Sequence, residues 1–188
     1  FLRTALGPIY VSGSVLTENA GVARKIDITA GQYWFSRLRF APTGGTALTY
    51  KDFYYVAGVL SEFSGTTLDN TKYDNLTDLV NLTAGYYVKH SVYIAGYGVN
   101  ETYAVVRGQA EYSTLLAAQQ ADLPTPPAFF GDNTASIAAV IMQQGTNSIV
   151  DIIDIRPRIG FQSPSTSASA DHGSLLGLAD DDHTQYLR

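Results

Sequence analysis

The nine residues Gln32-Tyr33-Trp34-Phe35-Ser36-Arg37-Leu38-Arg39-Phe40 show the pattern from which the fold class can be predicted. Aromatic and branched side chains favour β-strands, and successive side chains in a strand point to opposite faces. We predict that one side of this strand faces the core and that the other meets water or a neighbouring subunit. The core side carries Trp34, Leu38 and Phe40, and the outer side carries Tyr33, Phe35, Arg37 and Arg39.

Similar short runs recur along the chain. The sequence holds 13 Tyr and 8 Phe, and turn-forming Gly, Pro, Asn and Asp separate the apolar runs. Strands with turn signals about every ten residues are typical of a β-sandwich or barrel. We therefore expect an all-β fold, a jelly-roll-like antiparallel β-sandwich, over residues 1–161. The predicted strands are residues 9–16, 22–28, 32–40, 47–50, 53–62, 86–97, 103–109, 137–143 and 148–155.

Three segments have sequence patterns that indicate something other than a strand with one apolar face. Residues 53–60 are apolar on both faces, which indicates either the centre of a sandwich or a subunit interface. Residues 114–121 favour one short helix, with Ser113 as its cap and with prolines following it. Residues 69–78 are rich in Asp and Asn but lack the order of a calcium-binding loop, so we predict a loop of ordinary polarity.

Charge and composition narrow the classes of function. The formal net charge is −5 and no basic run is present, which argues against a nucleic-acid partner. Only 15% of residues are charged, as in proteins whose surfaces are partly buried in an assembly. The absence of cysteine excludes disulfides and fits synthesis in a bacterial cytoplasm. No apolar run approaches the roughly eighteen residues of a membrane span, so we expect no membrane insertion and no secretory signal.

The character of the chain changes after Phe161. Residues 162–170 carry no large apolar side chain, which predicts a Ser/Thr/Ala/Pro linker. The last residues read Asp171-His172-Gly173-Ser174-Leu175-Leu176-Gly177-Leu178-Ala179-Asp180-Asp181-Asp182-His183-Thr184-Gln185-Tyr186-Leu187-Arg188. This tail resembles a junction motif of bacteriophage tail fibres and other virion structural proteins, D-H-G-S-L-x-G-L-x-D-D-D-H-x-Q-Y, and every defined position matches. Because the chain starts at Phe1, we also expect it to be a piece of a longer protein.

The resemblance implies assembly, since fibres of this family are usually homotrimers. One copy of the tail would bury its few large apolar side chains for about 2 kcal/mol each, which cannot offset ordering about eighteen residues at roughly 1–2 kcal/mol each. We therefore expect residues 171–188 to be a trimerisation segment. The expected oligomerisation residues are Leu175, Leu176, Leu178, His183 and Tyr186. The expected interface residues on the β domain are Phe53, Tyr55, Tyr87, Tyr93 and Tyr97.

Trimerisation would also gather the acidic residues 180–182 of three copies. Like charges about 4 Å apart repel by about 4 kcal/mol at an effective dielectric near 20. These carboxylates must therefore point outward as helix caps, pair with Arg188 or His183, or bind a cation. His172 and His183 could form three-fold rings of metal ligands. Hydrogen-bonded structural histidines are the preferred interpretation, so we expect neither a metal nor a cofactor.

Nothing in the sequence predicts an enzyme. His90 shares a strand face with Val88, Val92 and Ile94, which predicts a buried, hydrogen-bonded histidine. No Ser or Cys nucleophile stands near it in a recognisable pattern. The glutamates are isolated in sequence and form no acid pair for glycoside cleavage; they include Glu62, Glu101 and Glu111.

Two functions are favoured, with a depolymerase fragment as a third hypothesis that would need two carboxylates within about 5–10 Å in a cleft, and a capsid or baseplate protein as a neighbouring structural interpretation. The resemblance favours a structural module of a phage tail fibre or similar virion appendage, located in the virion and connected to further fibre segments and other tail proteins. The alternative is a module that binds carbohydrate or another host receptor for host attachment. An exposed groove lined by Tyr or Trp, with Asp, Asn or Arg nearby, would support that alternative. Aromatic residues that need not be core are Tyr33, Phe35, Tyr87, Tyr93 and Tyr97.

Overall fold

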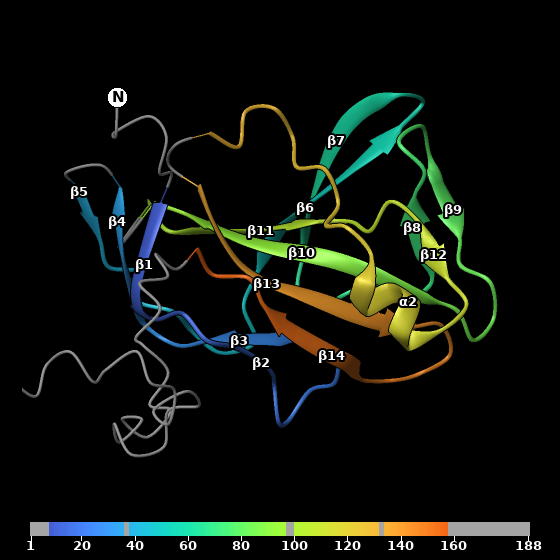
Figure 1. Ribbon diagram of the computed structural model, residues 1–188, viewed down its shortest axis with the longest axis horizontal. Coiled ribbons are helices and arrows are strands. Elements are labelled where there is room, and N and C mark those ends of the chain that lie inside the picture. The colour runs from blue at the N-terminus through green and yellow to red at the C-terminus, as the bar shows by residue number, and fades with distance from the viewer. Residues whose placement is uncertain (1–7, 36–37, 97–99, 132–133, 158–188) are drawn as a thin grey trace, which may run out of the picture. The chain divides into compact units, whose positions relative to one another are not determined.

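The structure is a computed structural model that describes residues 8–157, apart from 36–37, 97–99 and 132–133. Its main sheet has the strand order β14-β13-β10-β11-β6-β7, with β12 paired to β10 (Figure 1). The strands are β6 (Tyr50–Val56), β7 (Val59–Gly65), β10 (Tyr87–Ala95), β11 (Thr102–Val106), β12 (Glu111–Tyr112), β13 (Thr134–Gln143) and β14 (Ile149–Asp154). Strands thus predominate in the described residues, as the sequence predicts for an all-β chain.

One strand pair in the main sheet differs from the antiparallel expectation. β6 and β11 run parallel, with Asp52 opposite Val105, whereas the other neighbours in this sheet are antiparallel. A parallel pair needs a long crossover connection. The chain supplies one, because it passes through β7, β8, β9 and β10 between β6 and β11.

Smaller sheets cover one face of the main sheet. They contain β1 (Pro8–Gly13) with β4 (Gly31–Phe35) and β5 (Leu38–Phe40), β2 (Leu16–Glu18) with β3 (Ile26–Ile28), and β8 (Lys72–Asp74) with β9 (Leu79–Asn81). Leu16, Ile26 and Ile28 are buried in one apolar cluster with Val88 and Val92 of β10. We call this side of the main sheet the inner face.

The opposite, outer face carries the helix α2 (Leu115–Gln120), which lies across β10 and β13 (Figure 1). The predicted helix is confirmed, but its cap is Thr114 rather than Ser113. The Thr114 hydroxyl accepts a hydrogen bond of 3.1 Å from the Ala117 backbone N–H, which otherwise has no helical partner. No helix among the described residues is long and apolar enough to span a membrane.

The predicted strand over residues 32–40 is wrong in two respects. It forms two strands that pair with each other, so that Tyr33 lies opposite Phe40 and Phe35 opposite Leu38. Its faces are also mostly misassigned: Tyr33 is buried while Trp34 and Leu38 are exposed, and of the three residues predicted to face the core only Phe40 packs against it. Both sides of this stretch carry large aromatic rings, so alternation alone could not tell which side faces the core.

The predicted strand over residues 53–62, which contains the stretch 53–60 that is apolar on both faces, is also two strands rather than one. β6 and β7 form a hairpin whose two-residue turn is Ala57-Gly58, with φ angles of 49° and 72°. Turns of this kind match the twist of paired strands and require positive φ at both positions. Of the predicted segment 47–50, only Tyr50 lies in a strand. The strands expected over 86–97 and 148–155 are present but shorter, the strand expected over 103–109 runs from Thr102 to Val106, and the strand expected over 137–143 begins earlier, at Thr134.

Candidate functional site

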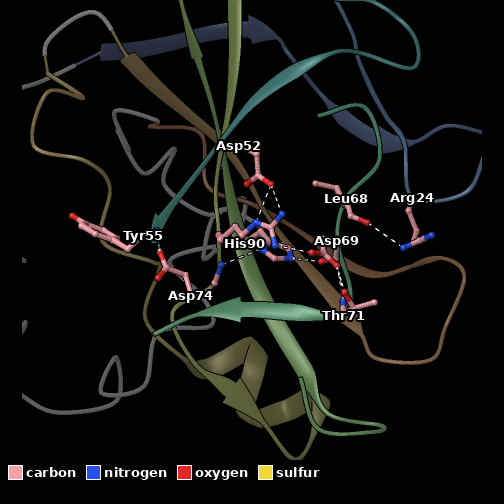
Figure 2. A network of polar contacts seen from close by, with 10 residues as sticks. Arg24, Asp52, Tyr55, Leu68, Asp69, Thr71, Asp74 and His90 are labelled. Atoms are coloured by element: carbon pink, nitrogen blue, oxygen red, sulfur yellow. Dashed lines mark hydrogen bonds and ion pairs between the residues drawn. The ribbon is translucent and has the colours of Figure 1, made fainter. Parts of the chain in front are cut away.

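The most heavily interlinked polar residues surround Arg107, which follows β11. Among them are Asp52, Asp69 and His90 (Figure 2). The Nε and Nη2 atoms of Arg107 donate to the same oxygen, Oδ2 of Asp52, at 2.9 and 2.7 Å. Its Nη1 donates to Asp69 Oδ2 at 2.6 Å, and the guanidinium stands 5.1 Å from the Tyr54 ring centroid. Arg107 and Asp52 are buried, so the two carboxylates compensate a charge that would be costly alone.

The pKa values of the two carboxyl groups around Arg107 shift in opposite directions. Burial raises the pKa of Asp52, and its Oδ1 is a buried atom without a hydrogen-bond partner in the described structure. Burial would also raise the pKa of Asp69, but hydrogen bonds from Thr71 and the charge of Arg107 outweigh burial and lower that pKa. Arg107 thus lies between one carboxyl group whose pKa is raised and another whose pKa is lowered.

His90 lies beside this ion cluster, and the prediction of a buried, hydrogen-bonded histidine is confirmed. Its Nδ1 accepts from the Gly108 backbone N–H at 3.0 Å, and its Nε2 is 3.0 Å from the Asp69 carbonyl oxygen, to which it donates as the neutral tautomer. Burial, reinforced by the Arg107 charge, lowers the pKa of His90 to about 4. Both ring nitrogens are thus occupied by the backbone.

The Asp- and Asn-rich segment 69–78 is more than a solvated loop, which corrects that prediction. It contains β8, and its side chains tie it to distant strands. Asp74 accepts from the backbone N–H groups of Tyr55 and Leu76 at 3.0 and 2.8 Å. Buried Asn70 donates to the carbonyls of Gln143 and Thr146 and accepts from Arg24. Short polar side chains that satisfy backbone groups are typical of ordered turns, which composition alone could not separate from solvated ones.

The glutamates singled out in the sequence also have partners, and they lie apart. Glu101 accepts from the backbone of Thr43 and Gly44 at 2.7 and 3.1 Å. Glu111 accepts from Thr83, and Glu62 pairs with Lys51 at 2.9 Å. Within the described part of the chain, no group of three or more His, Asp or Glu residues could hold a metal ion.

A second polar feature is a cavity of about 300 Å³ beside α2, and the sequence reasoning missed it. Lys89, almost entirely buried, donates from Nζ to the carbonyl oxygens of Gln119 and Ala121 at 3.0 and 2.6 Å. These carbonyls end the helix, where a positive charge is favourable. The signal in the sequence was a lysine inside the apolar run of β10. The cavity is lined by Lys89, Gln109, Ala110, Tyr112, Asp122, Leu123, Pro124 and Thr125.

The cavity has a rigid rim and a mixed polar lining. The Gln109 side chain donates to the Thr125 carbonyl and accepts from the Thr125 N–H, at 3.0 and 2.9 Å, which fixes the proline-rich segment after α2. Burial lowers the pKa of Lys89, and the negative charge of Asp122 opposes that shift. An ammonium, a carboxylate and a phenol thus border one open space.

The expected interface residues fall into three groups. Phe53 and Tyr93 are buried in a small cluster on the outer face, where Phe130 packs edge-on against both rings at 5.2 Å. Little of either ring remains for a neighbouring subunit, because their own chain covers them. Tyr55 and Tyr87 are half-buried and retain exposed surface. The remaining predicted residues lie outside the described part of the chain: Tyr97, Leu175, Leu176, Leu178, Tyr186, His172 and His183, with the linker 162–170.

Comparison of the chain with protein-family models, with curated proteins and with solved structures finds no match.

Proposed function

We propose that this chain is a structural module of a bacteriophage tail fibre or similar virion appendage, made in the bacterial host cytoplasm and assembled as a homotrimer. The observation that carries the proposal is the sequence of residues 171–188, in which every defined position of the junction motif is matched. The tail would set the three-fold register and connect the β domain to further fibre segments or other virion proteins.

The polar residues of the β domain support a mechanical role. The side chains of Arg107, Asp69 and His90 are engaged with other parts of the same chain. Asn70 and Asp74 likewise join loop 69–78 to distant segments. Such contacts fix the relative positions of strands and loops, which a module under mechanical stress requires. They leave the buried histidine without a free nitrogen for proton transfer, so we propose no catalytic activity.

Light scattering of the whole chain tests the proposal. A homotrimer has three times the mass of the 20.3 kDa chain, and we expect that mass at tens of micromolar. Removal of residues 171–188 should weaken association while leaving the far-UV circular dichroism of the strands intact. A strict monomer with the tail present would overturn the proposal, and loss of the strand signal on removal would show that the tail belongs to the folding unit.

The cavity beside α2 favours one second candidate, a carbohydrate- or receptor-binding module. It meets the condition set from the sequence, because Tyr112 lines an open polar cavity together with Asp122 and Gln109. Its volume is at the lower end of the range for small-molecule sites. An aromatic ring can stack on a sugar face while carboxylate and amide groups bind its hydroxyls.

Binding of host polysaccharides on a glycan array tests this candidate. If the cavity binds sugar, Asp122→Ala should weaken binding at least about tenfold, which corresponds to about 1.4 kcal/mol. Glu62→Ala, on the surface far along the sheet, serves as the control and should bind like the unmodified chain. Silence of the unmodified chain across host polysaccharides would end this candidate and leave the structural proposal standing.

A further inference from the structure

The hairpin of β6 and β7 carries apolar side chains that the described part of the chain leaves uncovered. Val59 and Phe63 are 65% and 58% exposed, and Val56, the cross-strand partner of Val59, is also exposed. Strand β7 is the last strand in the order of the main sheet (Figure 1). An edge strand in a monomer is usually protected by charged side chains or proline, because unpaired edges invite association. This edge has a charged residue, Glu62, on one of its faces only, and its other face carries two large apolar groups.

A neighbouring loop adds a fourth apolar side chain under an unusual backbone constraint. The turn of the hairpin is bound to residues 77–78, because Ala57 N donates to Asp78 Oδ1 and Gly58 N to the Thr77 carbonyl, each at 2.9 Å. Leu76, next in the loop, is exposed and has a φ of 69°. That conformation is unfavourable for a bulky residue with a Cβ atom. The loop thus holds an apolar side chain in solvent at a conformational cost, which indicates a use for it. We call Val56, Val59, Phe63 and Leu76 the apolar tip.

The exposed side chains on this face of the hairpin carry no charge. Alternation along β7 places Ser61 between Val59 and Phe63 on one face, and places Glu62 and Ser64 on the other. The hairpin's ion pair, Lys51 with Glu62, therefore lies on the face opposite Val59 and Phe63. This separation matters for the choice of partner, because the whole chain carries a net charge of −5.

We propose that the apolar tip packs against a second copy of this chain. In a symmetric ring, residues near the axis meet their own copies, so any charge there would face a like charge. A partner of different sequence could carry compensating charges, so its binding would not require an uncharged surface on this chain. Beside the apolar tip the turn binds one exposed carboxylate, Asp78, through the Ala57 N–H, while the tip's own side chains carry no charge, so identical copies of this acidic chain can approach through them. The inference rests on the proposed homotrimer and gives it an interface on the β domain, separate from the tail.

Charge insertion into the whole chain, followed by light scattering, tests the tip. Val59→Lys should convert the trimer to smaller species at tens of micromolar, because identical ammonium groups would meet at the contact. Ser64→Lys is the matched control: it adds the same charge to an exposed position of the same strand, on the opposite face, and should leave the mass unchanged. Circular dichroism confirms that both variants keep their strands.

Cross-linking provides a second measurement that does not depend on destabilising the assembly. The chain has no cysteine, so Val59→Cys and Ser64→Cys each introduce a single thiol. With a short bis-maleimide, Val59→Cys should form a covalent dimer and Ser64→Cys should not. Suppose that the unmodified chain is a trimer, that Val59→Lys is also a trimer and that Val59→Cys does not cross-link. The proposed contact through the apolar tip is then wrong, and the proposed function stands. A monomeric unmodified chain would overturn both.

Discussion

Acidification should destabilise the folded β domain through His90, in a pH window above the ordinary range of carboxyl groups. In the folded chain, burial and the nearby Arg107 lower the pKa of His90 to about 4, whereas its ordinary value is 6.5. Between these values the unfolded chain binds a proton that the folded chain does not. The stability contributed by neutral His90 is therefore complete above pH 6.5 and is lost as the pH falls toward 4.

The size of the effect follows from the two pKa values. Each unit of separation is worth about 1.4 kcal/mol, so lowering the pH from 7.5 to 5 should reduce the free energy of unfolding by about 2 kcal/mol. For a domain of this size, that corresponds to a fall of roughly 4–8 °C in the melting temperature. Asp52 acts in the opposite sense, because burial raises its pKa and the folded chain then takes up a proton before the unfolded chain does.

A comparison of variants isolates the histidine from the carboxylates. Urea unfolding of the unmodified chain and of His90→Gln should be measured from pH 7.5 to 5. Glutamine cannot titrate, so the variant should be less stable at pH 7.5 but should lose about 2 kcal/mol less on acidification. Ser64→Gln, at an exposed position of β7, is the control and should keep the unmodified slope. Equal slopes for the unmodified chain and His90→Gln would refute the reasoning.

Three further predictions concern stability. Arg107→Met should reduce the free energy of unfolding by about 3–5 kcal/mol at pH 7, because it leaves two carboxylates without their ion pair. Urea unfolding should show that this reduction becomes smaller below pH 5, as the carboxylates protonate. Gly58→Ala should lower the free energy of unfolding by about 1 kcal/mol, since the φ of Gly58 is +72° and nothing lies within 4 Å of the added methyl group. Gly44→Ala should lower it several times more, because at nearly the same φ the methyl group would clash with the Ile28 carbonyl oxygen. Equal melting temperatures of the two variants would contradict this. Thr114→Ala should cost about 1 kcal/mol in thermal unfolding by loss of the α2 cap, and Ser113→Ala should be neutral.

The sequence predicted best where one physical signal dominated. The long strand β10 is rich in branched and aromatic residues, β13 is rich in small and branched apolar residues, and both lie near their predicted positions. The burial of His90 followed from its place among Val88, Val92 and Ile94. Helix α2 followed from helix-favouring residues before a group of prolines. In these cases, propensity, periodicity and the surrounding residues all favoured the same structure.

Prediction failed where two signals conflicted or where the partner was distant in sequence. Ala57-Gly58 carried only a weak turn signal inside an apolar run, so the hairpin was taken for one strand. In the stretch 31–40, aromatic rings on both sides hid the direction of the core. The ion cluster depends on contacts between residues far apart, such as Asp52 and Arg107, and no local pattern reports such a pairing. The role of Lys89 depends in the same way on the end of a helix some thirty residues away.

The hydrogen bonds and the ion pair made by loop 69–78 affect how the domain unfolds. Through Asn70 and Asp69 this loop is joined to Arg24, to Arg107 and to the Gln143–Thr146 turn, which lie far from one another along the chain. Unfolding of this loop would break contacts with several regions of the domain at once. Slow amide hydrogen exchange should therefore extend from β10 into this loop, and denaturation should be a single cooperative step without a detachable subdomain.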